Sequence, residues 1–133
     1  AGLSFDEHAA GCANYSDEQS YEEMKRILCQ AHPPTAMFCA NDLMAMGVVR
    51  AAEEKGLSVP GDLAVVGFDD IEASHYFRPT LTTFRPPLRE VGEKAVDLLI
   101  GILQNPRRTP EQIPMNAKLI IRDSSGPLVS VDQ

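Results

Sequence analysis

Residues 35–70, TAMFCANDLMAMGVVRAAEEKGLSVPGDLAVVGFDD, decide the fold of this chain. The stretch begins and ends with short apolar runs, residues 35–40 and 63–68, whose β-forming residues and flanking turn residues are typical of strands buried on both faces. The residues between them have helical spacing and stop at Gly56, which suits the left-handed position after a helix. A strand, a helix and a second strand of this length predict two parallel strands joined by a right-handed crossover.

Polar residues follow both predicted strands. Asn41 comes after the first strand and Asp69 after the second. Parallel strands bring their carboxyl ends to one edge of a sheet, where open α/β sheets bind ligands. A carboxylate accepts two hydrogen bonds and an amide both donates and accepts, so the pair suits adjacent hydroxyl or ring N–H groups. We therefore expect Asn41 and Asp69 to contact one small molecule, and Tyr15 offers an aromatic face for stacking.

Each of these residues also has a purely structural interpretation. Asn41 could cap the helix that follows it, Asp69 could cap a turn in the next loop, and Tyr15 could belong to the core. The pair Asn41 and Asp69 is more informative than either residue alone, because the crossover geometry places the two together.

The helix after Asp42 is apolar around much of its circumference, which is more than one core-facing stripe requires. Two interpretations follow: the helix is buried between the sheet and neighbouring elements, or its second face meets another subunit. The sequence alone leaves both open.

The remaining elements are predicted from periodicity, capping and turn residues. Ser16 and Gln19 form a capping-box pattern before a helix, and Pro87 begins a long helix that reaches Gln104. The loop over residues 69–80 is long for a compact domain, which suggests a role in function. Further expectations are a strand over residues 9–15, a strand over residues 81–85, pairing between residues 113–115 and 118–122, and a mobile tail over residues 124–133.

The composition excludes several classes of protein. The chain has 133 residues, enough for one domain, and a net charge of −7, which disfavours direct binding to nucleic acid. Three cysteines, with no CxxC pair, indicate reduced thiols in a cytosolic protein. No apolar run is long enough to span a membrane. The sequence patterns of serine hydrolases, P-loop proteins, dinucleotide-binding proteins and zinc proteases are absent, so we expect neither an enzyme nor a cofactor or metal site.

Several motifs together resemble the lactose/galactose repressor (LacI/GalR) family of bacterial transcription regulators. They are AND-x-x-A-x-G at residues 40–47, VPGDLAVVGFDD at residues 59–70, PTLTT at residues 79–83, a helix containing VGEKAVDLL, and LIIRDSS at residues 119–125. The resemblance covers nearly the whole chain, and its motifs are specific in combination although each is weak alone.

The resemblance implies a three-layer α/β sandwich with a parallel sheet, namely the C-terminal lobe of a fold like that of periplasmic binding proteins. Residues 1–125 would form most of this effector-binding and dimerisation lobe, and residues 126–133 a flexible tail. The DNA-binding headpiece and most of the first lobe would precede Ala1. The implied protein is a cytoplasmic, homodimeric repressor that senses a sugar-like or nucleoside-like effector and contacts operator DNA only through that headpiece. The alternative is a lobe of a periplasmic sugar-binding protein for transport or chemotaxis.

The resemblance also implies roles for particular residues. Tyr15, Asn41, Asp69 and Arg85 fall at positions that contact the effector, whereas Pro86 replaces a polar residue often found in the cleft. The family's dimer surface would place Met46, Tyr76 and Phe77 near a partner subunit, which agrees with the second interpretation of the apolar helix.

Overall fold

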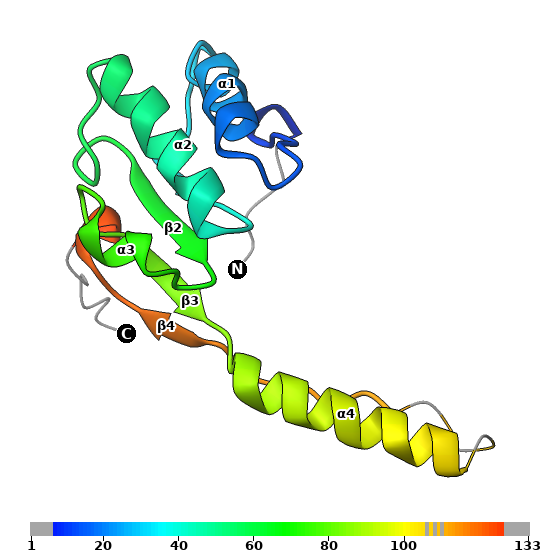
Figure 1. Ribbon diagram of the computed structural model, residues 1–133. Coiled ribbons are helices and arrows are strands. Elements are labelled where there is room, and N and C mark those ends of the chain that lie inside the picture. Colours follow the sequence, from blue (N-terminus) through cyan, green and yellow to red (C-terminus); the bar gives the residue numbers. More distant parts are fainter. Residues whose placement is uncertain (1–6, 106, 108, 110, 127–133) are drawn as a thin grey trace, which may run out of the picture.

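A computed structural model describes residues 7–105, 107, 109 and 111–126, and these include a four-stranded sheet with two long helices, α1 and α2, on one face (Figure 1). The sheet order is β1-β2-β3-β4, in which β1, β2 and β3 are parallel and β4 is antiparallel to β3. The elements in chain order are η1 (Glu7–Ala9), α1 (Asp17–Ile27), β1 (Ala36–Phe38), α2 (Asp42–Glu54), β2 (Ala64–Phe68), α3 (Ala73–Tyr76), β3 (Thr82–Arg85), α4 (Leu88–Gln104), β4 (Lys118–Ile120) and η2 (Asp123–Ser125). The α/β fold class is confirmed.

The predicted strand–helix–strand unit is confirmed as β1, α2 and β2. Ala36 of β1 lies opposite Ala64 of β2 in parallel register. Asn41 is the N-cap of α2, and Gly56 follows the helix with φ of 80°. The helix predicted after Ser16 is α1, where the Ser16 hydroxyl accepts a hydrogen bond from the Gln19 N–H at 3.3 Å.

The core lies between the sheet and the two helices α1 and α2. Leu63, Val65 and Leu81 are fully buried, as expected for alternate residues of the strands and their flanks. Helix α1 lies directly against α2, because Gly47 has no side chain: a Cβ there would lie 2.2 Å from the Asp17 carbonyl oxygen. The helices thus bury one face of the sheet and each other.

The opposite face of the sheet is open in the described part of the chain. It carries an apolar hollow of about 590 Å³, although parallel sheets are normally covered on both faces. Phe38 is 62% exposed there, and its ring lies 6.2 Å from that of Phe84. The described residues therefore supply two layers of the sandwich, the α1–α2 layer and the sheet.

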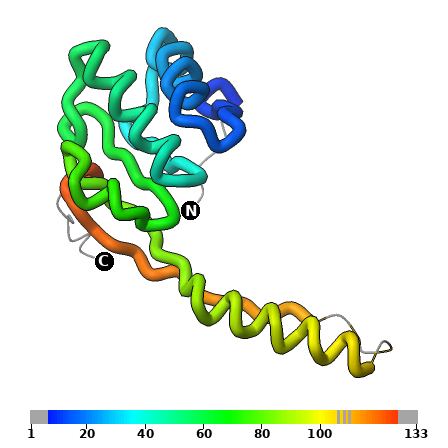
Figure 2. The backbone as a smooth tube through the Cα atoms, viewed as in Figure 1, coloured from blue at the N-terminus to red at the C-terminus, as the bar shows by residue number. Residues whose placement is uncertain are grey.

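Helix α4 projects away from the rest of the structure (Figures 1 and 2). The structure describes all of α4, and none of its residues is buried. Its apolar side chains are nevertheless numerous and exposed: Leu88, Val91, Val96, Leu99, Ile100, Ile102 and Leu103. The start and length of this helix agree with the sequence prediction, since Pro87 precedes its first residue.

Three predictions of local structure are wrong. Residues 9–15 form no strand; the chain there leaves η1 and turns at Asn14 and Tyr15, which have positive φ. Residues 113–115 do not pair with residues 118–122, because β4 pairs with β3 instead. The tail was expected to bury little, but Ser124 is fully buried and donates to the Val65 carbonyl at 2.7 Å. The rest of that tail, residues 127–133, lies outside the described residues.

The loop over residues 69–80 contains the short helix α3. None of the helices that the structure describes is long and apolar enough to cross a membrane.

Candidate functional site

The carboxyl edge of the parallel strands brings Asn41 and Asp69 to the same side of the sheet. Asn41 follows β1 and Asp69 follows β2, which pair in parallel. The next residue after Asn41, Asp42, accepts a hydrogen bond from the Ile71 N–H at 2.9 Å. The segments that carry Asn41 and Asp69 are therefore in direct contact, as the crossover geometry predicts.

Asn41 caps α2, and this use leaves part of its side chain for a ligand. Its Oδ1 accepts a hydrogen bond from the Met44 N–H at 2.8 Å. The structural interpretation of Asn41 is thus confirmed. The capping bond occupies the oxygen, however, and the amide NH2 group still provides two donors at the edge of the sheet.

Asp69 presents an exposed carboxylate on an unusual backbone. Its φ is 107°, a value that few residues other than glycine adopt, and its N–H donates to the Phe84 carbonyl at 2.9 Å. Partial burial and the nearby charge of Asp42 raise the pKa of Asp69. Its ionised form therefore has an unmet demand for hydrogen-bond donors, which a ligand hydroxyl or N–H group can supply.

Tyr15 lies before the N-terminus of α1, which packs beside the first turns of α2: the Ser20 hydroxyl donates to the Met44 carbonyl at 3.0 Å. The Tyr15 side chain is 71% exposed, so the interpretation of Tyr15 as a core residue is wrong. Its ring is therefore free of the core, but no described contact joins Tyr15 to Asn41 or Asp69.

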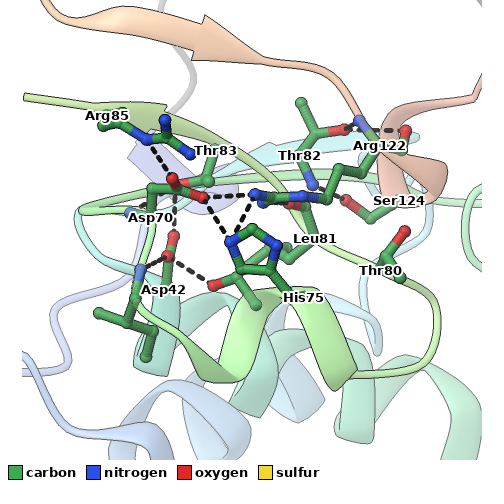
Figure 3. Close-up of polar contacts among 12 residues, drawn as sticks. Asp42, Asp70, His75, Thr80, Leu81, Thr82, Thr83, Arg85, Arg122 and Ser124 are labelled. Atoms are coloured by element: carbon green, nitrogen blue, oxygen red, sulfur yellow. Dashed lines mark hydrogen bonds and ion pairs between the residues drawn. The ribbon is translucent and has the colours of Figure 1, made fainter.

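The fully buried Asp42 organises this edge, a role that its place in the sequence did not reveal. Its carboxylate accepts hydrogen bonds from the hydroxyls of Thr83 at 2.5 Å and Ser74 at 2.6 Å, besides the Ile71 N–H (Figure 3). Gly67 makes room for it, because a Cβ at that position would lie 2.3 Å from Asp42 Oδ1. One carboxylate thus joins α2, α3 and β3 at the edge that carries the half-buried Asn41 and the exposed Asp69.

Asp70 forms a second buried carboxylate centre, with Arg85 and Arg122 (Figure 3). Only 2% of its side chain is exposed. Burial alone would raise the pKa of Asp70, but hydrogen bonds and charges from Arg122 and Arg85 outweigh burial and lower it. Arg85, predicted to contact an effector, is 51% exposed and already bound to Asp70. A possible sequence signal was the Asp69-Asp70 doublet after a strand, but its partner Arg122 lies 52 residues away.

The residues predicted at a dimer surface differ in exposure. Tyr76 is 71% exposed, whereas Met46 and Phe77 are half-buried and Phe77 packs against the core. The sheet and α1 already cover most of the apolar circumference of α2, which supports burial within the chain as the reason for its composition. Among the described residues, no cluster of histidine, cysteine and acidic side chains could hold a metal ion.

Comparison with known proteins places this geometry in a family. The model of the periplasmic binding protein-like domain matches residues 1–125. The HTH-type transcriptional repressor PurR of Escherichia fergusonii is 42% identical over 111 residues, which are 84% of this chain and 33% of that protein. The chain thus spans about a third of the length of the curated relatives that it matches.

Solved structures agree with this assignment. The transcriptional regulator CelR in complex with cellobiose has a TM-score of 0.84 and 27% identity, covering 92% of this chain and 38% of that one. The lac repressor dimer bound to operator and the anti-inducer ONPF has a TM-score of 0.78 and 34% identity, covering 86% of this chain and 34% of that one. The chain therefore belongs to the periplasmic binding protein-like domain family, and within it to the effector-binding domains of LacI/GalR regulators.

Proposed function

We propose that this chain is the effector-sensing part of a DNA-binding transcription regulator, in which Asn41 and Asp69 bind a small ligand with several hydroxyl or N–H groups. The observation that carries the proposal is the position of an exposed carboxylate and a free amide NH2 group at the carboxyl edge of one parallel sheet. Binding without catalysis fits this edge, because its groups accept, donate and stack.

The effector class follows from the same groups. The Asp69 carboxylate accepts two hydrogen bonds from vicinal hydroxyls or from a ring N–H, and Tyr15 stacks on the apolar face of a sugar or base. We therefore propose a sugar-like or nucleoside-like effector. The cellobiose held by the similar regulator CelR supports the sugar class, and the anti-inducer bound to the lac repressor supports ligand control of a regulator.

Three finer parts of the proposal concern the whole regulator. Operator DNA would be bound by a headpiece outside this chain, because the net charge of −7 disfavours contact between this chain and DNA. The regulator would act as a homodimer in the cytoplasm, where its operator lies. The relatives reported above are regulators, which favours this function over the alternative of a periplasmic sugar-binding protein.

The test is effector binding by the complete polypeptide that contains this chain. Isothermal titration against hexoses, pentoses, disaccharides, nucleosides and nucleobases identifies the ligand. Asp69→Ala is then expected to weaken its binding by about tenfold to a hundredfold, because a hydrogen bond to a charged group contributes about 1.5–3 kcal/mol. Operator affinity without ligand is expected to stay unchanged.

Asp97→Ala provides the matched control, since it removes an exposed carboxylate of α4 that lies 3.8 Å from the Lys94 ammonium group. Its ligand affinity should equal that of the unchanged protein. Unchanged ligand affinity in Asp69→Ala would remove the proposed site.

A further inference from the structure

Two segments of the chain connect α4 to the body, which we define as residues 7–85 and 118–126. The first segment leaves the end of β3 through Arg85, Pro86 and Pro87 and enters α4 (Figure 1). The second returns from α4 into β4 and continues to Arg122 and η2. No described residue of α4 is buried, so packing on the described body does not fix its direction. The direction of α4 therefore depends on the two connecting segments.

The Asp70 side chain binds both segments, one through each carboxylate oxygen (Figure 3). Arg85, at the end of β3, donates from Nε to Asp70 Oδ2. Arg122, just after β4, donates from Nη2 to Asp70 Oδ1 at 2.5 Å, and from Nη1 to the Leu81 carbonyl at 2.6 Å. His75 Nε2 lies 3.7 Å from Asp70 Oδ1 and 3.1 Å from Arg122 Nη2. We refer to Asp70, Arg85 and Arg122 as the Asp70 clamp.

This arrangement requires a carboxylate. Two arginines of different segments need two acceptor oxygens, and an amide side chain offers only one. Arg122 is 11% exposed and Asp70 is 2% exposed, so water screens their attraction less than it screens a surface ion pair. Separating Asp70 from one of its arginines would leave a poorly solvated charge without a partner. Because that state is costly, the clamp is expected to stay closed and to resist bending.

The backbone of the clamp residue Asp70 continues directly into the candidate effector site. Asp69 and Asp70 both have positive φ, 107° and 52°, a conformation that residues with a side chain seldom adopt. Both N–H groups are held by β3: that of Asp69 by the Phe84 carbonyl at 2.9 Å, and that of Asp70 by the Thr83 hydroxyl at 3.3 Å. Any rearrangement of the residues around Asp70 thus reaches Asp69 through one peptide bond.

We propose that Asp70 is a positioning residue that fixes the candidate effector site and α4 to each other. Its carboxylate holds the two segments that carry α4, and its backbone continues directly into Asp69. A displacement of Asp69 thereby changes the direction of α4, and a change in the direction of α4 displaces Asp69. The role of Asp69 in binding an effector rests on the proposed function, whereas the clamp rests only on the contacts described above.

The first test measures the direction of α4 in this chain. Spin labels are placed on the native Cys29, which is exposed on the body, and on Gln104→Cys at the far end of α4. Cys12→Ser removes the other exposed thiol, and Cys39 is buried. Pulsed electron paramagnetic resonance then gives the distribution of distances between the labels. We expect a narrow distribution, and Asp70→Asn is expected to at least double its width.

Arg85→Gln is the second variant, because Arg85 is half-exposed and its replacement leaves Asp70 bound to Arg122. It is expected to broaden the distribution less than Asp70→Asn and to leave the body folded. Arg89→Gln is the matched control: Arg89 lies one turn further on, 91% exposed, and pairs with Glu93 of the same helix. This control is expected to leave the width unchanged.

The second test asks whether a change in the segment that enters α4 reaches the backbone of Asp69. In ¹H–¹⁵N spectra, Arg85→Gln is expected to shift the amide resonances of Asp69 and Asp70, and Arg89→Gln to shift neither. The proposal is overturned if Arg85→Gln behaves like Arg89→Gln in both the distance width and the Asp69 resonance. Neither measurement uses a ligand, so this result is independent of whether Asp69 binds an effector.

Discussion

The fold disfavours the ionised form of Asp69. Burial and the charge of Asp42 raise its pKa above the ordinary value of 3.8. An acid with a raised pKa in the folded state binds its proton more tightly there than in the unfolded chain, so its ionisation lowers stability as the pH rises. A carboxylate kept at this cost, on a positive-φ backbone, is typical of a residue retained for binding.

Asp69→Asn is therefore expected to stabilise the chain slightly at pH 7 while it weakens ligand binding. The gain should be a few tenths of a kcal/mol, because solvent screens the exposed carboxylate. It should shrink as the pH falls through the raised pKa of Asp69 and disappear below 3.8, where the carboxyl is protonated in both states. Thermal unfolding followed by circular dichroism at several pH values tests this. A lower melting temperature at pH 7 would contradict the assignment.

The three cysteines are expected to differ in reactivity, because burial affects the ionisation of a thiol as it affects that of a carboxyl group. Cys12 and Cys29 are exposed, whereas burial and the Asp42 charge raise the pKa of the Cys39 thiol to about 12. The thiolate is the reactive form, so Cys39 is expected to stay unmodified at pH 8. Ellman's reagent should titrate two thiols in the folded chain and the third only in denaturant. Rapid reaction of all three would show that Cys39 is not buried.

At the scale of the elements, glycine decides how closely α1 approaches α2. Gly47→Ala is expected to destabilise the chain by about 1–3 kcal/mol, because the new methyl group meets the Asp17 carbonyl and the Ser20 hydroxyl oxygen and forces the helices apart. Gly92→Ala is the control: it also lies within a helix, but nothing lies within 4 Å of its Cβ position. Its effect should be neutral or stabilising by up to about 1 kcal/mol. If the two variants changed the free energy of unfolding in urea equally, the close packing of α1 against α2 at Gly47 would be contradicted.

The elements that the sequence predicts correctly are those whose signals are local. Helices α1, α2 and α4 have periodic apolar residues, caps or an initial proline, and β2 has a continuous apolar run. The strand predicted over residues 9–15 fails because a strand needs a pairing edge, and no local pattern reveals whether one is available. Pairing of β4 with β3, rather than with residues 113–115, is likewise decided by distant contacts.

The candidate site likewise contains residues whose positions could be predicted from the sequence and residues whose positions could not. Asn41 and Asp69 were predictable, since a crossover places the ends of adjacent parallel strands together. The buried carboxylate of Asp42 was not, because its partners Ser74 and Thr83 lie 32 and 41 residues away. The pairing of Asp70 with Arg122 spans 52 residues. Side chains that support a site from below are selected by the assembled fold, and their spacing in the sequence carries no signal.

For the whole molecule, the open sheet face and the exposed apolar side chains of α4 are notable in a chain that spans about a third of its curated relatives. We expect the proposed homodimer to form through the surface that includes Tyr76. Tyr76→Ala should weaken dimerisation of the complete polypeptide without changing ligand affinity. Tyr15 has the same exposure of 71%, and Tyr15→Ala should weaken ligand binding without changing dimerisation. Sedimentation velocity measures the dimerisation of each variant, and calorimetry measures its ligand affinity. A complete polypeptide that is monomeric at high micromolar concentration would contradict the proposed dimer.

The most direct test of the central claim is a double-mutant cycle of ligand affinity with Asn41→Ala, Asp69→Ala and the double variant, measured by calorimetry on the complete polypeptide. If both side chains contact one ligand, each single change weakens binding, and the double change departs from additivity by about 0.5–3 kcal/mol. If both single variants bind the ligand as tightly as the unchanged protein, the carboxyl edge of the sheet is not the effector site.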